Sequence, residues 1–218
     1  MIKENIQNIK AKLPEHVTLV AVSKTKPIAD IQEAYNAGQR IFGENKIQEM
    51  VSKYDVLPKD IQWHMIGHLQ RNKVKYMAHF VDLIHGVDSF KTLVEINKQA
   101  KKHDRVIKCL LQVHIAEESS KFGLSSEEIE YILTSEEIKD LQNIKIVGLM
   151  GMATFTDQQE QITSEFNSLK DLFNKLNNTN ELTTLSMGMS GDYTLAIASG
   201  STMIRVGSSI FGNRNYIT

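Results

Sequence analysis

Short apolar runs rich in β-branched residues recur along the chain, and each is followed by a segment whose apolar residues repeat with helical spacing. This alternation is the pattern of a parallel β/α fold, because two parallel strands need a helical crossover between them. The apolar runs predict eight strands, at residues 17–24, 40–43, 61–67, 83–87, 108–115, 144–151, 184–189 and 203–207.

The segments between these runs predict helices. Residues 28–36 end shortly before Gly38, residues 93–102 have a basic last turn, and residues 161–176 form a long amphipathic stretch. An additional helix is predicted at the N-terminus, over residues 2–13, which would cover an end or side of the fold. Eight β/α units favour a single α/β domain over residues 1–218, a closed (β/α)8 TIM barrel. No G-x-G-x-x-G motif follows the first strand to indicate a dinucleotide fold.

Composition and charge narrow the class of partner. Apolar residues make up 41% of the chain, enough for a substantial core. The 25 basic and 26 acidic residues nearly cancel, so we expect no binding to nucleic acid or to an anionic membrane. The chain has no apolar run of membrane-spanning length and no apolar secretory leader, which favours the cytoplasm. Its single cysteine, Cys109, lies in an apolar strand, and we expect a buried, inert thiol.

The first predicted strand ends in VTLVAVSKTKP, and Lys24 stands out in it. Functional groups of a β/α barrel lie at the C-terminal ends of its strands. Strand alternation places Lys24 on the same face as Val20 and Val22. We expect burial beside Val22, together with the nearby charge of Lys26, to lower the pKa of Lys24 and make its amine nucleophilic. On spacing alone, an ordinary surface lysine remains an alternative.

The last two units predict a phosphate site. In LSMGMSGDYTLAIASG, glycines and serines stand between the seventh strand and a helix, and Ser190 is suited to cap that helix. In MIRVGSSIFG, the eighth strand ends in Gly207, Ser208 and Ser209. Loops after strands seven and eight commonly bind phosphate in this fold.

Arg205 shares a strand face with Gly207 and is expected to reach over the barrel mouth. A buried guanidinium needs a partner, and either a pyridine nitrogen or Asp192 would serve. The spacing of His64 and His68 would suit a metal only on a helix; since His64 falls in a predicted strand, we expect no metal site. The basic segment QRNKVKY is expected to be a solvated helix start, with anion or nucleic-acid binding the minor alternative.

Several motifs together resemble a known family. They are AVSKTKP, IFGEN, WHMIGHLQRNK and LSMGMSGDYTLAIASGSTMIRVGSSIFG, and HGVDSF, SSKFGL and VGLMGMA stand between them in the same order. Over nearly its whole length the chain resembles the pyridoxal phosphate homeostasis protein family. The resemblance implies a fold-type III barrel similar to the N-terminal domain of alanine racemase, with pyridoxal 5′-phosphate held as a Schiff base on Lys24.

The resemblance also implies which residues contact the cofactor. They are Lys24, Asn45, Ser186, Met187, Arg205, Gly207 and Ser208. Arg205 is implied to face the ring nitrogen and Asn45 to approach from the second strand, whereas the serines, Met187 and Gly207 are implied to surround the phosphate.

The family resemblance implies a carrier and regulator of pyridoxal phosphate in vitamin B6 and amino-acid balance. Because the chain ends at Thr218, soon after the eighth unit, we expect no counterpart of the β-domain that supplies the catalytic tyrosine of alanine racemase. No catalytic residue is therefore assigned. The implied partners are the cofactor and apo forms of enzymes that use it, for a chain that is a monomer or weak homodimer.

Two alternatives remain open at this stage. The first is an amino-acid racemase or related enzyme using the same cofactor, which would show turnover abolished by Lys24→Ala. The second is a cofactor-free barrel in which Lys24 acts as an aldolase-type Schiff-base lysine on a phosphorylated sugar, which would be colourless.

Overall fold

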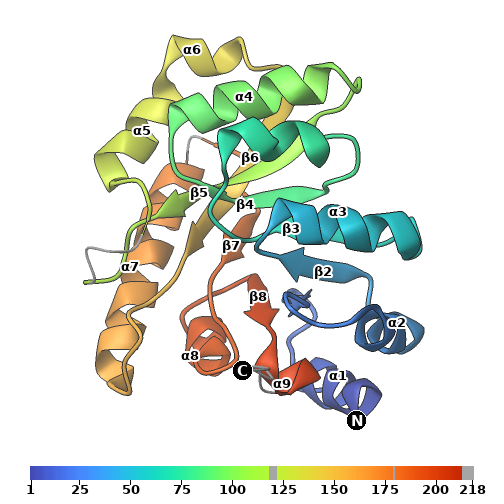
Figure 1. Ribbon diagram of the computed structural model, residues 1–218. Helices are drawn as coiled ribbons and strands as arrows, with labels where there is room; N and C mark the ends of the chain where they lie inside the picture. Colours follow the sequence, from blue (N-terminus) through green and yellow to red (C-terminus); the bar gives the residue numbers. More distant parts are fainter. Residues whose placement is uncertain (118–121, 179, 213–218) are drawn as a thin grey trace.

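Eight parallel strands close into a barrel (Figure 1). The computed structural model describes residues 1–117, 122–178 and 180–212. Within these residues the strands are β1 (Thr18–Val22), β2 (Ile41–Glu44), β3 (Gln62–Met65), β4 (Leu83–Val87), β5 (Ile107–Val113), β6 (Ile144–Gly151), β7 (Thr184–Ser186) and β8 (Met203–Val206). They follow one another in chain order around the ring, and β1 pairs with β8 to close it. The expected (β/α)8 barrel is confirmed.

Helices surround the strands. They are α1 (Ile2–Lys10), α2 (Ile28–Asn36), α3 (Ile47–Val56), the 3-10 helix η1 (Arg71–Tyr76), α4 (Phe90–Lys101), α5 (Ser126–Thr134), α6 (Glu136–Lys139), α7 (Gln159–Asn177), α8 (Tyr193–Ala198) and α9 (Ser208–Phe211). Local signals explain two of these starts: Ser89 caps α4, and Ser125 with Glu128 forms a capping box on α5. No helix among the described residues combines the length and apolar character needed to cross a bilayer.

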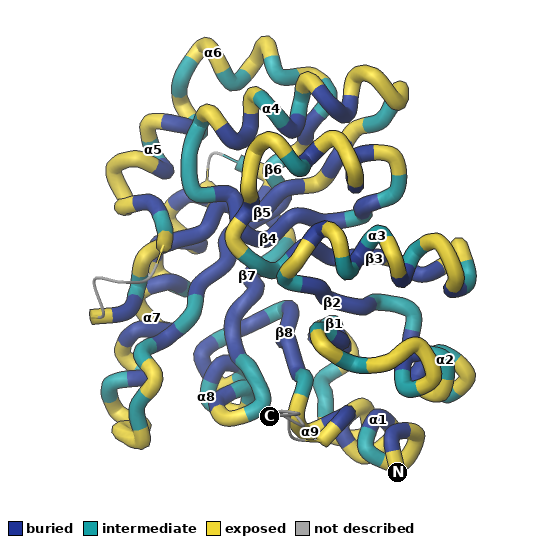
Figure 2. Tube along the Cα trace, viewed as in Figure 1, coloured by how far each residue is buried: buried dark blue, intermediate teal, exposed yellow. Residues whose placement is uncertain are grey.

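Burial follows the two faces of each strand. Figure 2 shows buried strands enclosed by helices whose outer faces are exposed. Leu19 and Ala21 of β1 belong to the large core between strands and helices, whereas Val20 belongs to a smaller cluster contributed by strands alone. This smaller cluster fills the ring interior, as expected for a barrel with a packed centre.

The predicted N-terminal helix exists but ends at Lys10. Its buried face, Ile2, Ile6 and Ile9, packs the helix beside α2 and α9 (Figure 1). It therefore covers the side of the barrel where the first and last strands meet.

Several predicted strands extend too far at their C-terminal ends: β3 and β5 each end two residues earlier than predicted, and β1 and β7 also end early. β1 ends at Val22 rather than at Lys24, because the backbone turns at Thr25, which has a φ of 66°. β7 ends at Ser186 rather than at residue 189, and the chain turns at Gly188, whose φ is 99°. Both strands therefore stop before the residues of chemical interest, which lie in the loops at the barrel mouth.

Candidate functional site

A cavity of about 810 Å³ lies at the C-terminal ends of the strands. Residues from the loops after several strands line it, among them Lys24 after β1, Asn45 after β2 and Gly207 after β8. Of the seven residues predicted to contact the cofactor, five line this cavity: Lys24, Asn45, Arg205, Gly207 and Ser208. Residues far apart in the sequence therefore meet at one place.

Lys24 lies in a four-residue turn, residues 23–26, that is closed by a 3.0 Å hydrogen bond from the N–H of Lys26 to the carbonyl of Ser23. We call it the Lys24 turn. Lys24 is half-buried and lines the cavity together with Val22, although β1, on which this shared face was predicted, ends at Val22. Thr25 at the third position has positive φ, a conformation that a β-branched residue rarely adopts.

Buried charges stand directly behind this turn. The Ser23 hydroxyl donates to Glu44 Oε1 at 2.5 Å, and Lys53 Nζ donates to the same oxygen at 2.8 Å. Lys53 also donates to the Ser23 carbonyl at 2.8 Å and to Glu49 Oε1 at 2.7 Å. Burial raises the pKa of the Glu44 carboxyl, and the Lys53 ammonium opposes that rise. Sequence reasoning missed this cluster, although the i,i+4 spacing of Glu49 and Lys53 was a visible signal.

Lys26, expected to act on the charge state of Lys24, makes two contacts to the last helix. Its Nζ donates to the carbonyls of Phe211 at 3.0 Å and Gly212 at 3.1 Å. Lysines commonly satisfy carbonyls at a helix C-terminus. Lys26 thus ties the loop after β1 to α9, and its influence on Lys24 remains a prediction.

Arg205 reaches the cavity from β8 with its side chain buried. Nη1 donates to the Ser186 carbonyl at 2.9 Å and to the Ser186 hydroxyl at 2.6 Å, and Nη2 donates to the Gly151 carbonyl at 3.1 Å. Burial lowers the pKa of Arg205 to about 10, and the charge of Asp192 opposes the shift, so the guanidinium is protonated at neutral pH. Asp192 Oδ1 itself accepts from the Met189 N–H at 2.5 Å.

Two buried histidines continue inward from Ser186. His85 Nδ1 lies 3.1 Å from the Ser186 hydroxyl, and His85 Nε2 lies 3.0 Å from His64 Nδ1. His64 Nε2 in turn lies 3.6 Å from Asp82 Oδ2, and Asp82 directly precedes β4, at the end of the barrel opposite the cavity. Burial lowers the pKa of both histidines, that of His85 further through the charges of His64 and Arg205. In its neutral form each ring can accept a hydrogen bond at Nδ1 and donate one from Nε2. The hydrogen bonds can therefore all run in the same direction, from Ser186 toward Asp82.

The predicted phosphate turns face the cavity with one correction. Ser190 does not cap α8, because that helix begins at Tyr193; its hydroxyl instead accepts from the Gly207 N–H at 3.1 Å. A Cβ at Gly207 would lie 3.3 Å from both Cβ and O of Val22, so the position favours glycine. Ser208 follows at the start of α9, where first-turn N–H groups have no intrahelical acceptor.

Ser186 and Met187 lie deeper than the other predicted residues. Met187 is fully buried in the core, and its N–H donates to the Met203 carbonyl at 3.1 Å. Ser186 is also fully buried and contacts Arg205. Met189, Ser190 and Gly191 line the cavity in their place.

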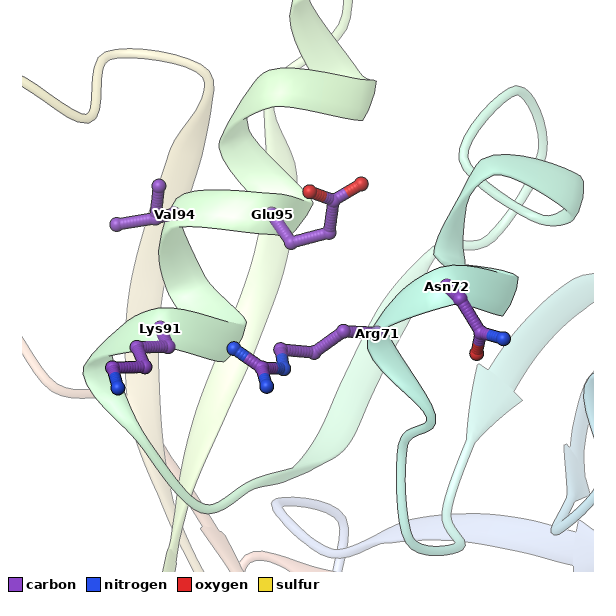
Figure 3. A pocket seen from close by; sticks show the side chains of 5 residues that line it. All are labelled: Arg71, Asn72, Lys91, Val94 and Glu95. Atoms are coloured by element: carbon purple, nitrogen blue, oxygen red, sulfur yellow. The ribbon is translucent and has the colours of Figure 1, made fainter.

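A second hollow lies between η1 and α4, and Figure 3 shows Arg71 extending from η1 toward the first turn of α4. Arg71, Asn72 and Lys91 are exposed there. This agrees with a solvated face for the basic segment. Among the described residues, no three His, Cys, Asp or Glu side chains cluster closely enough to hold a metal ion.

Comparison with known proteins finds relatives that span this chain. The sequence profile described as "Alanine racemase, N-terminal domain" matches residues 1–215. Proteins called pyridoxal phosphate homeostasis protein are 40% identical in Vibrio alginolyticus, over 99% of this chain and 98% of that one, and 42% identical in Synechocystis sp., over 94% and 95%.

Solved structures agree with the sequence comparison. PipY of Synechococcus elongatus without PLP is 37% identical and superposes with a TM-score of 0.92, covering 97% of this chain and all of that one. The same protein with PLP bound gives a TM-score of 0.89. Alanine racemase from E. faecalis shares the fold at 16% identity and a TM-score of 0.74, with 98% of this chain matching 58% of that one.

Proposed function

Because this chain belongs to the pyridoxal phosphate homeostasis protein family, we propose that it binds pyridoxal phosphate in the cavity at the barrel mouth, covalently through Lys24. The observation that carries the proposal is that one cavity is lined by an amine, a buried guanidinium and a glycine-serine turn. These three groups match the aldehyde, the ring nitrogen and the phosphate of the cofactor. The relative with PLP bound supports the choice of cofactor.

The residues at the cavity fit the chemistry of this ligand. Pyridoxal phosphate supplies, when bound, an aldehyde that condenses reversibly with amines. Lys24 is the amine, on a turn that projects it beside Val22. Gly207, which packs against Val22, leaves the adjoining part of the cavity wall free of a side chain, so an anion can approach Ser208 and Ser190 closely.

Arg205 sets the electronic character proposed for the site. A guanidinium that is protonated at neutral pH donates hydrogen bonds and accepts none, so a ring nitrogen facing it stays unprotonated. An unprotonated pyridine withdraws fewer electrons from the reacting carbon. Arg205 therefore makes the bound ring a weaker electron sink than a protonated pyridine would be.

The side chains around the cavity support a carrier rather than a racemase that uses a catalytic tyrosine. No tyrosine is among the cavity-lining residues in the described part of the chain. His68, which does line it, is stacked on Phe122 and lies 3.1 Å from Asp88 Oδ2.

We propose that the protein takes up free pyridoxal phosphate in the cytoplasm and passes it to apo-enzymes, as a monomer or weak homodimer.

The attachment site is tested by borohydride reduction of the cofactor-loaded protein, followed by peptide mass spectrometry. We expect the added mass on Lys24, and we expect Lys24→Ala to lose both the adduct and the visible absorption band. Lys26→Ala is the matched control: it should keep the adduct, since Lys26 Nζ bonds carbonyls of α9. An adduct on Lys26 alone would contradict the assignment.

The carrier role is tested by transfer. Loaded protein mixed with an apo-enzyme that needs pyridoxal phosphate should restore that enzyme's activity, and Lys24→Ala should not. Single L-amino acids incubated with the loaded protein should keep their optical rotation. Steady racemisation abolished by Lys24→Ala would favour an enzyme instead.

A further inference from the structure

The Lys24 turn is held on both sides of Lys24 by a single cluster of charges. On one side Lys53 Nζ donates to the Ser23 carbonyl at 2.8 Å. On the other side the Thr25 N–H donates to Glu49 Oε1 at 2.6 Å. Glu49 Oε1 also accepts from Lys53, so both contacts belong to one connected network on α3.

The conformation that this network holds is unfavourable by itself. Thr25 has a φ of 66°, and a β-branched side chain in the left-handed region is strained. Such strain persists only where surrounding contacts over-determine the backbone. The hydrogen bond from Thr25 to Glu49 is a contact of this kind.

The network is also buried more deeply than stability alone would favour. Glu44 is fully buried and Lys53 is 4% exposed. Among the described atoms, Glu44 Oε2 has no hydrogen-bond partner. A buried ion pair adds little net stability, because desolvation opposes the attraction, but it fixes geometry. Here the fixed geometry is that of the residues flanking Lys24.

We propose that Glu49 and Lys53 are positioning residues that hold the Lys24 turn in its strained conformation and so preorganise the Lys24 amine for pyridoxal phosphate. The inference rests on the proposed function, since it concerns how the same cofactor is bound. Without the network, the apo turn would relax at Thr25 and carry Lys24 away from the cavity. Binding would then have to restore the turn, which weakens affinity.

Glu49→Ala is the sharpest test. Lys53 is a poorer target, because its loss leaves Glu44 buried without a cation. Glu49 is 25% exposed, and in Glu49→Ala the ammonium of Lys53 keeps its pairing with Glu44. The measurement is the dissociation constant for pyridoxal phosphate, by absorbance titration of the apo-protein. We expect Glu49→Ala to raise it by about tenfold, the size of a lost hydrogen bond to a charged group.

Two further variants separate positioning from general stability. Glu130→Ala is the matched control, because Glu130 is also a helical glutamate paired with a lysine, Lys175, and is 39% exposed. Its melting temperature can fall, but its dissociation constant should stay within about twofold of wild type, since surface pairs act weakly and locally. Adding Thr25→Gly to Glu49→Ala should recover most of the lost affinity, because glycine adopts positive φ without strain.

The outcomes are distinguishable. Wild-type protein that attaches no pyridoxal phosphate to Lys24 would overturn the proposed function and, with it, this inference. Wild-type attachment with an unchanged dissociation constant in Glu49→Ala would overturn the inference alone. So would a loss of affinity that Thr25→Gly does not reduce, because strain at Thr25 would then not be what Glu49 opposes.

Discussion

Arg205 shows how much one side chain contributes to the wall of the cavity. Its guanidinium donates to three oxygens, two on Ser186 and one on Gly151. Each of these contacts uses a different direction of a planar, rigid fork. A lysine would carry the same charge on a single compact ammonium group and could not reach all three.

Arg205→Lys is therefore expected to destabilise the apo-protein by about 2 kcal/mol, since buried oxygens lose charged donors. The free energy of unfolding, from urea titration, measures this. Arg71→Lys serves as control because Arg71 is exposed, and a change below about 0.5 kcal/mol is expected there. Equal losses in the two variants would contradict the role given to the fork.

Residue-level periodicity predicted the direction of these side chains but not their partners. Alternation placed Val22 and Lys24 on the interior face and Arg205 beside Gly207, because strand geometry repeats every two residues. The oxygens that hold Arg205 belong to β6 and β7, and strand pairing alone brings them close. Likewise, no local signal marked Thr25 for positive φ, since glycine or asparagine is the usual residue there.

At the scale of elements, the ring interior contains a hydrogen-bonded path between strands. It leads from Ser186 on β7 through His85 on β4 to His64 on β3 and ends near Asp82, just before β4. Because burial lowers the pKa of both histidines, the folded protein keeps them neutral at a pH where the unfolded chain begins to protonate them.

This difference predicts a loss of stability in mild acid. The contribution of the two neutral histidines to the free energy of unfolding is complete above about pH 6.5, the ordinary histidine pKa. It is lost as the pH drops toward the lower pKa values of the folded state. Each histidine contributes a slope of at most about 1.4 kcal/mol per pH unit in that range. Apo-protein should therefore unfold in less urea at pH 5.5 than at pH 7.

His85→Gln should make this pH dependence shallower. His16→Gln, a change at an exposed position, should leave it as in wild type. An equal pH dependence of stability in His85→Gln and wild type would contradict a lowered pKa of His85 in the folded protein.

Elements were predictable in kind and less so in length. Apolar runs gave the right bounds for β4 and β6, most of whose residues are buried. β1 and β7 end earlier than predicted, because the backbone turns at Thr25 and at Gly188. Apolar character reports burial, and residues at the barrel mouth are buried without being extended.

For the whole molecule, the site depends on contacts between the two ends of the described chain. Asn5 of α1 donates to the Ile210 carbonyl of α9 at 2.9 Å, and Lys26 donates to the next carbonyl, that of Phe211. α9 begins with Ser208, which lines the cavity. The N-terminal helix thus supports the wall where the phosphate is proposed to bind.

Ile6→Ala and Ile96→Ala form a matched pair that tests this support. Both isoleucines are fully buried on a helix, Ile6 on α1 and Ile96 on α4. Each truncation should lower the free energy of unfolding by about 3 kcal/mol. Only Ile6→Ala should also weaken pyridoxal phosphate binding, as measured by absorbance titration, because α1 packs against α9 whereas α4 packs against η1, β5 and β6. Equal affinities of the two variants for pyridoxal phosphate would contradict a role of α1 in supporting the site.

The pairing of β1 with β8 has a consequence for the life of the protein in the cell. Lys24 follows the first strand of the seam, and Arg205 and Gly207 belong to or follow the last. A nascent chain that has left the ribosome only as far as β7 carries the amine without the guanidinium of Arg205 or the turn after β8 where the phosphate is proposed to bind. If the cofactor binds as proposed, it can be loaded only after the final strand has docked. Pyridoxal phosphate bound to residues after both β1 and β8 would stabilise the pairing of these strands by mass action. A higher concentration of the cofactor would then make the folded protein more resistant to unfolding.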